Sequence, residues 1–383
     1  MPANNWDLPV QVVYALGGVA RNVAECMSKL GAKPFMISAV GFDLAGSLLL
    51  EHWESDGLSV AGIQRKQDIE TAVICHIFDG KGEVAAGVAS VEAIEKFLTP
   101  EWIHNFKFNI CSAPILMVDA NLSPAALVAC CKSMKLPVHS STCFPLCRIL
   151  AAECQTSVWF EPVSVTKSKR VASILKYITF TSPNEDELVA MANALSSGDK
   201  FLPIQRDCGS VQLSVDSLFQ ALKPAIWVLL EKGIRVVIVT LGADGLFLCF
   251  KHTHGVDKCD LIKNRRSSFS RKLYEAINVS CPPGRILGAP NPKGGYYVAI
   301  HFPSLSASVV RLTGAGDCLV GGAVASICAG LDIMQSLAVG IASAKGAVET
   351  ETNVPAEYEL TKISDDAGSV YSGAKVIFCG SKL

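Results

Sequence analysis

The segment Thr313 to Asp317 (TGAGD) places small residues and one acid directly before an apolar stretch. Small residues let a ligand approach the main chain, and the first amides of a helix attract an anion. Such amides can stabilise negative charge on a phosphoryl group in transfer. Asp317 can accept the proton of an attacking hydroxyl. The alternative is that Thr313 only caps the helix and Asp317 only complements the helix dipole.

Four other short motifs combine glycines, polar residues and a turn. They are GGVARN at 17–22, VGFDLAG at 40–46, NEDE at 184–187 and TLGADG at 240–245. Together with LTGAGDCLVGG at 312–322, and in this order, they resemble the signatures of the ribokinase-like (PfkB) family of sugar and nucleoside kinases. The resemblance covers most of the chain, from residue 10 to residue 350.

The resemblance implies that ATP donates a phosphoryl group to an alcohol, with Mg²⁺ as cofactor. Asp317 would be the general base that activates a primary hydroxyl. The main-chain amides of the preceding residues would form the anion hole: Gly314, Ala315 and Gly316. A member that keeps the fold but has lost activity is the alternative.

The resemblance also assigns the other motifs to the bound molecules. The substrate-binding residues would be Gly17, Gly18, Asn22 and Asp43. The ATP-binding residues would be Asn184, Thr240, Gly242 and Gly245, with Gly245 keeping its turn open. Glu187 would organise Mg²⁺ through water. Helix caps are the alternative: a plain cap for the first glycine pair, and a capping box of Asn184 with Glu187.

The combination of GGVARNVAE at 17–25 with VWFEPVS at 158–164 resembles the pseudouridine kinase branch of the family. The implied reaction is phosphorylation of the 5′-hydroxyl of pseudouridine by ATP. Arg21, where many sugar kinases of this fold have a small residue, could equally be a solvated helix residue. Ribokinase, adenosine kinase, fructokinase and a non-catalytic nucleoside-binding member remain alternatives. A dinucleotide-binding oxidoreductase is not expected, because the first turn lacks the GxGxxG fingerprint.

Three departures from the family pattern stand out. Only 16 residues precede Gly17, so the family's first strand and its sugar-gripping acid are expected to be missing. The Cys-rich segment 139–157 fits neither strand nor crossover and is interpreted either as an insertion or as an artefact of splicing or gene prediction. Val310, Arg311 and Leu312 stand where many relatives carry an Asp before the Thr, which argues against a monovalent-cation (K⁺) site.

The elements that must position these residues follow from the spacing of apolar side chains. Strands are expected at 10–16, 35–40, 115–119, 158–161, 177–181, 236–240 and 246–250. Helices are expected at 19–30, 48–54, 124–134, 185–195, 214–232, 314–329 and 333–348. This alternation predicts an α/β, ribokinase-like three-layer sandwich with a central, mostly parallel sheet. Residues 1–59 and 88–383 would form the kinase domain, and 60–87 a small β-hairpin lid.

Composition restricts the partners. The chain has 34 basic and 35 acidic residues, so its net charge of -1 creates no field that would collect nucleic acid or an anionic membrane. Half the residues are hydrophobic, yet the most apolar stretch, Leu319–Leu331, is too short for a membrane span. The start lacks a secretory signal, so the 15 cysteines are expected to be reduced thiols.

The C-terminal tripeptide Ser381, Lys382 and Leu383 spells a peroxisomal address, with the cytoplasm as the alternative location. Its reader is a soluble import receptor. The exposed hairpin expected at 60–87 predicts a homodimer, because such flaps often pair between subunits in this family.

Overall fold

The computed structural model describes residues 14–78, 84–90, 92–133, 156–196, 198–204, 214–252, 271–284 and 296–381. Its strands are β1 (Ser38–Gly41), β2 (Ile63–Lys66), β3 (Val73–Phe78), β4 (Val84–Ser90), β5 (Ile115–Asp119), β6 (Ser157–Glu161), β7 (Phe180–Thr181), β8 (Val236–Thr240), β9 (Leu246–His252), β10 (Tyr296–Phe302) and β11 (Lys375–Gly380).

The longer helices are α1 (Val19–Lys29), α2 (Leu44–Ser55), α6 (Pro124–Ser133), α10 (Glu185–Leu195), α11 (Val215–Glu231), α12 (Arg271–Ser280), α13 (Ala315–Ala329), α14 (Ile333–Val348) and α15 (Leu360–Gly373). The shorter helices are α3 (Glu92–Phe97), α4 (Pro100–His104), α5 (Lys107–Ser112), α8 (Val165–Ser168) and α9 (Val171–Ile174), with 3₁₀ turns η1 (Leu175–Tyr177) and η2 (Gly242–Asp244). No described helix is long and apolar enough to cross a membrane.

Seven strands form one sheet in the order β11-β10-β9-β8-β7-β6-β5. The strands from β5 to β8 run parallel, as predicted, whereas β9, β10 and β11 each pair antiparallel with their neighbours. The sheet is therefore mixed. Its parallel half matters for function, because the carboxyl ends of parallel strands meet at one edge and the crevice beyond that edge is where α/β proteins bind ligands.

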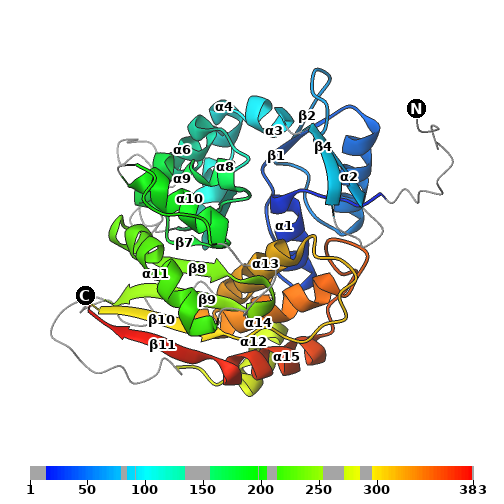
Figure 1. The fold of residues 1–383 in the computed structure, drawn as a ribbon. Coiled ribbons are helices and arrows are strands. Elements are labelled where there is room, and N and C mark those ends of the chain that lie inside the picture. Colours follow the sequence, from blue (N-terminus) through cyan, green and yellow to red (C-terminus); the bar gives the residue numbers. More distant parts are fainter. Residues whose placement is uncertain are drawn as a thin grey trace, which may run out of the picture.

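Helices cover both faces of this sheet, so the molecule has the three layers that the sequence predicts (Figure 1). The apolar residues of β8 alternate between the two cores. Val236 and Ile238 pack in the cluster with α1, α13, α14 and α15, while Val237 and Val239 pack with α6, α10 and α11. Successive side chains of a strand point to opposite faces, which explains why a central strand is apolar throughout.

Two small sheets lie apart from the large one (Figure 1). Strands β1 and β2 pair parallel, and β3 and β4 form an antiparallel hairpin. A hairpin is thus present within the region predicted as a β-hairpin lid, 60–87, and its second strand extends to residue 90. Its apolar side chains are solvent-exposed: Val73, Ile74, Ile77 and Val88 are 50 to 74% exposed.

Most other elements agree with the sequence. Helices α10 and α14 and strand β8 have the predicted bounds. Several elements were not predicted: strands β2, β10 and β11, the short helices α3, α4, α5, α8 and α9, and the longer helices α12 and α15. Of the strand expected at 10–16, residues 14–16 are neither strand nor helix, and the rest lies outside the described residues. The expected insertion is also too long at its end, because Ser157 belongs to β6; residues 139–155 lie outside the description.

Candidate active site

Helix α13 begins with main-chain amides that no side chain caps. Its N-cap is Gly314, in the left-handed conformation at φ 87°, and Thr313 makes no capping hydrogen bond. The capping alternative for Thr313 is therefore not observed. A Cβ on residue 314 would lie 2.2 Å from the carbonyl oxygen of Asn353, so only glycine fits this turn. The amides of Gly314 and Gly316 at this end are suited to binding an anion, whereas the Ala315 amide makes a long hydrogen bond of 3.4 Å to the carbonyl of Leu312.

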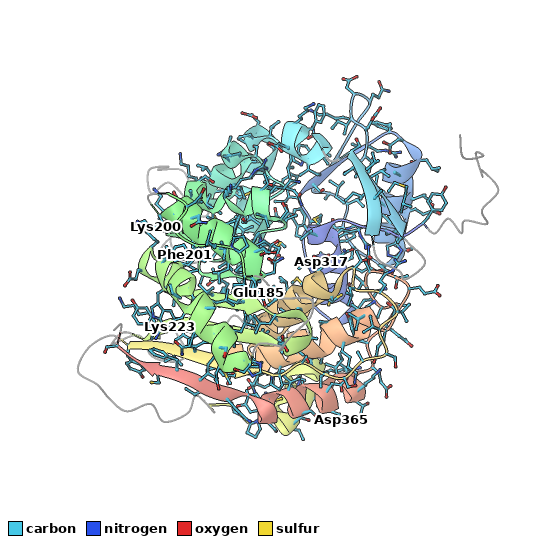
Figure 2. All side chains as sticks on the ribbon, in the orientation of Figure 1. Glu185, Lys200, Phe201, Lys223, Asp317 and Asp365 are labelled. Atoms are coloured by element: carbon cyan, nitrogen blue, oxygen red, sulfur yellow. The ribbon has the colours of Figure 1, made fainter. Side chains whose placement is uncertain are left out.

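Asp317 lies in the first turn of α13, near the middle of the molecule (Figure 2). Its Oδ2 accepts a 2.6 Å hydrogen bond from Nδ2 of Asn22, a residue of α1. The first and last motifs of the sequence, 295 residues apart, thus meet through side chains. Among the described residues, Asp317 makes no other side-chain hydrogen bond, which leaves its Oδ1 available to a substrate hydroxyl.

Burial raises the pKa of Asp317 to about 6. The hydrogen bond from Asn22 and the charge of Arg21 oppose this rise, and the charge of Asp119 adds to it. A carboxylate with a pKa near neutrality is a better proton acceptor than an ordinary one and is still ionised above pH 6. Asp317 is therefore placed and tuned for general-base chemistry.

Two further acids at the carboxyl edge of the sheet were not predicted as site residues. Asp119 ends β5 and lies opposite Glu161, the last residue of β6, in parallel register. Burial raises the pKa of both carboxyl groups, that of Glu161 most strongly. The charge of Asp317 adds to the rise of the Glu161 pKa, and the charge of Asp119 adds to the rise of the Asp317 pKa. An acid directly after each of two apolar strands was the sequence signal that could have found them.

The chain turns sharply after Glu161. Val163 has φ 66°, an unusual value for a β-branched residue, and the amide of Ser164 bonds to the carbonyl of Pro162 at 2.8 Å. This is a strained three-residue turn of the kind that occurs mostly at functional sites. Ser164 then caps α8 by accepting a hydrogen bond from the amide of Lys167. This turn sets the direction in which the chain leaves the end of β6, where Glu161 lies.

Gly17 and Gly18 form the turn before α1, next to the N-terminal end of α13. Gly18 has φ 105°, which favours glycine. Nδ2 of Asn353 donates to the carbonyl of Leu16 at 2.8 Å, while the Asn353 main chain contacts Gly314. Asn353 thus joins the two glycine turns, a role that nothing in its sequence surroundings indicates.

Asp43 lies in a different local environment from the one predicted. Its carboxylate caps α2 by accepting from the amide of Gly46 at 2.7 Å, and it also accepts from the amide and hydroxyl of Thr71 at 2.6 and 2.7 Å. Burial alone would raise its pKa, but the hydrogen bonds from Thr71 and Gly46 lower it. Asp43 joins the β1–α2 turn to the base of the β3–β4 hairpin. Direct substrate contact by Asp43 stays a prediction.

The NEDE motif adopts the capping box that was its alternative interpretation. The side chain of Asn184 accepts from the amide of Glu187, and the Glu187 carboxylate accepts from the amide of Asn184, both at 2.9 Å. The capping box leaves Glu187 buried, with a pKa raised by burial, and its charge acts on Glu161. Glu187 is buried and Glu161 is half-buried, and carboxylate oxygens are ligands that Mg²⁺ prefers; a role of Glu187 in organising Mg²⁺ stays a prediction.

The TLGADG turn lies beside this helix start, because Thr240 bridges to Asn184 and its amide bonds to the Pro183 carbonyl at 3.0 Å. Gly242, at φ 60°, faces open space. Gly245 instead packs tightly: a Cβ there would lie 2.0 Å from the Phe302 carbonyl oxygen. Gly245 therefore keeps β9 close to β10 rather than keeping the turn open. The assignment of these residues to ATP stays a prediction.

A family profile described as pfkB family carbohydrate kinase matches residues 4–260. The chain belongs to this family. It is 51% identical over 376 residues to the pseudouridine kinase of Arabidopsis thaliana, an alignment that covers 98% of this chain and 93% of that protein.

Solved structures agree on the fold. A putative sugar kinase from Clostridium perfringens matches with a TM-score of 0.63 at 19% identity, covering 98% of this chain and 91% of that one. A putative ribokinase II from E. coli, in complex with ATP and Mg²⁺, matches with a TM-score of 0.60 at 16% identity, covering 94% of this chain and 92% of that one. The ribokinase-like fold predicted from the motifs is confirmed.

Proposed function

We propose that this chain transfers the terminal phosphoryl group of ATP to the 5′-hydroxyl of pseudouridine. The observation that carries the proposal is the pairing of Asp317, a half-buried base with a raised pKa, with the amides at the start of the same helix, which no side chain caps. Such a pair serves a reaction in which an alcohol loses a proton while a phosphate gains charge. The identity of the nucleoside is supported by the likeness to the plant pseudouridine kinase.

In the proposed reaction the 5′-oxygen attacks the terminal phosphorus as its proton passes to Asp317. The new O–P bond forms as the bond to the bridging oxygen breaks, and ADP leaves with that electron pair. The amides of Gly314, Ala315 and Gly316 hold the equatorial oxygens while charge develops there. Asn22 keeps the Asp317 carboxylate in place, and the turn at Gly17 and Gly18 lets the ribose approach the main chain.

Bound Mg²⁺ would neutralise charge on the phosphates of ATP, and Glu187 and Glu161 are the residues that would hold it, directly or through water. Thr240 and Gly242 would contact the nucleotide on the neighbouring strand end. The segment at 310–312 carries no acid, and we do not include K⁺ among the cofactors.

The decisive experiment is a coupled ADP-release assay with pseudouridine, uridine, adenosine, ribose and fructose as acceptors. We expect pseudouridine to give the highest kcat/KM and the Asp317→Asn variant to lose most of that turnover. Preference for ribose or fructose would assign the chain to a sugar kinase instead. Pseudouridine binding by calorimetry without any ADP release would make it a non-catalytic binding protein.

We also propose that the β3–β4 hairpin is a lid that pairs with its copy in a homodimer. The exposed apolar side chains of both strands support this, since an unpaired hairpin with such a surface favours association. Sedimentation at micromolar concentration is expected to show a dimer, and Ile74→Lys with Val88→Lys is expected to give a monomer.

The proposed location is the peroxisome. Strand β11 ends at Gly380, and Ser381 is exposed, so the C-terminal tripeptide follows the fold directly and is suited to a soluble import receptor. A fluorescent protein fused to the N-terminus of the chain should enter peroxisomes. Removal of Leu383 should leave the same fusion in the cytoplasm.

A further inference from the structure

Arg21 is buried beside the candidate active site and is not a solvated helix residue. Its side chain is 11% exposed, although α1 begins only two residues before it. Its Nε donates to the carbonyl of Gly17 at 2.9 Å, and one terminal nitrogen donates to the carbonyl of Leu16 at 2.8 Å. The same nitrogen also donates to Oδ1 of Asn22. One guanidinium thus holds both the glycine turn and the side chain that contacts Asp317.

A second group holds the guanidinium in this position. The other terminal nitrogen of Arg21 pairs with Oε2 of Glu25, one helical turn further along α1. Glu25 is buried, and its Oε1 lies 3.2 Å from Nε2 of His52 on α2. The ion pair therefore connects the substrate end of α1 with the neighbouring helix.

The contact with Arg21 determines which way the Asn22 amide faces. An amide can rotate by half a turn and exchange its donor and acceptor ends, but a guanidinium has only donors. Because Arg21 requires the oxygen of Asn22, the nitrogen must face Asp317, where it donates the 2.6 Å hydrogen bond. Without Arg21, Asp317 alone would orient the amide, and a protonated Asp317 could donate to an Asn22 oxygen turned toward it.

We propose that Arg21, held by Glu25, is a positioning residue for the phosphoryl-transfer site. It fixes the orientation of the Asn22 amide, and through it the carboxylate of Asp317, while binding the carbonyls of the turn that receives the sugar. The proposal rests on the proposed function in two respects: that Asp317 is the base, and that the turn at Gly17 and Gly18 receives the sugar. The hydrogen bonds of Arg21 and Asn22 are observed independently of that function. Arginine is required because a lysine ammonium is one compact charge and cannot contact three acceptors and a carboxylate from a planar fork.

The charges around Asp317 predict the direction of the effect. From α1 it faces Asn22 and Arg21, and from the ends of β5 and β6 it faces the acids Asp119 and Glu161. Among the residues that the structure describes, Arg21 is the cation whose charge opposes the upward shift of the Asp317 pKa caused by burial. Loss of Arg21 removes that charge and releases the Asn22 donor, so both changes raise the pKa of Asp317 further.

The test measures this ionisation without relying on turnover. Aspartate carboxyl carbons are labelled with ¹³C in the full chain, and the signal of Asp317 is assigned by its loss in Asp317→Asn. The wild-type signal is expected to titrate near pH 6. In Arg21→Met we expect the midpoint to rise by roughly one pH unit, the size of effect that a neighbouring charge and hydrogen bond produce. An unchanged midpoint in folded Arg21→Met overturns the proposal.

Kinetic measurements then separate the effect of the Arg21 hydrogen bonds on position from the effect of its charge. With the acceptor that the wild-type chain phosphorylates, we expect Arg21→Lys to keep the charge yet lower kcat about 10-fold or more at pH 8, because a misplaced base costs that much. Full wild-type kcat in Arg21→Lys overturns the positioning role, and this variant also decides the matter if Arg21→Met does not fold. A wild-type chain that phosphorylates nothing rejects the proposed function but leaves the titration test intact.

The matched control is Lys29→Met on the same helix. Lys29 pairs with Asp56 of the α2 C-terminus at 2.9 Å and does not contact Asn22. The substitution therefore removes an ion pair between α1 and the end of α2, with side chains 21% and 18% exposed, and leaves the Arg21–Glu25 pair in place. We expect a wild-type Asp317 midpoint and a wild-type kcat, whereas a shift equal to that of Arg21→Met would show that any loosening of α1 is sufficient and would overturn the specific role of Arg21.

Discussion

Replacement of Gly314 by alanine should damage both stability and catalysis, because the glycine lies at a left-handed turn pressed against another main chain. The left-handed conformation costs a non-glycine residue about 1–2 kcal/mol. The new Cβ would lie 2.2 Å from the Asn353 carbonyl oxygen, far inside van der Waals contact. Overpacking of this kind adds about 1–3 kcal/mol. We therefore expect the free energy of unfolding to fall by about 2–5 kcal/mol.

The catalytic loss has a separate cause. To relieve the clash, either the first turn of α13 or the segment around Asn353 must move. Asn353 also bonds to the carbonyl of Leu16, directly before the turn at Gly17 and Gly18. A displacement of the anion-hole amides by about 1 Å costs roughly 100-fold in turnover. Urea unfolding gives the stability, and ADP release at saturating substrates gives kcat on the folded fraction.

Gly316→Ala, two residues further along, is the control for stability. Its Cβ would meet nothing within 4 Å, and its φ is not positive. Alanine is the better helix former, so the free energy of unfolding should stay the same or rise by about 0.5–1 kcal/mol. If Gly314→Ala proves as stable as Gly316→Ala, the argument that the turn is sterically closed is refuted.

Four further predictions concern single carboxylates. Asp317→Asn should lower kcat by roughly 10²–10⁴-fold with ATP affinity nearly unchanged, measured by ADP release and nucleotide titration. Because burial raises the pKa of Asp317 to about 6, the same variant should be more stable than wild type at pH 8 by about 1–2 kcal/mol, a difference that urea unfolding at pH 4 should no longer show. The wild-type kcat/KM should fall as the pH drops through about 6, since the base becomes protonated; a flat profile from pH 5 to 8 would remove Asp317 from that role. Asp43→Ala should lose about 2 kcal/mol in thermal unfolding, because three hydrogen bonds to Gly46 and Thr71 disappear.

Elements with a strong local signal were predictable. The apolar period of α14 and its Asp332 cap, or the continuous apolar run of β8, leave little choice of conformation. The elements that were missed depend on distant partners. Strand β11 is half exposed and is stabilised by its ladder with β10, some 75 residues earlier in the chain. Helix α12 packs on α15 within a polar stretch, so neither element has a pattern that stands out alone.

The residues of the candidate site also fall into two groups: those that the sequence indicated and those that only the folded chain revealed. Residue types and spacing pointed to the TGAGD segment, because an anion site and a general base demand such residues at a helix start, whereas the glycine pair and Asn22 came from the resemblance to the family. Only the folded chain placed Asn22 on Asp317, added Asp119 and Glu161 at the ends of adjacent strands, and buried Arg21 against the glycine turn. Distance between remote residues and exclusion of water are products of packing. They decide the pKa of Asp317 and the direction of its hydrogen bond, and no stretch of sequence contains either.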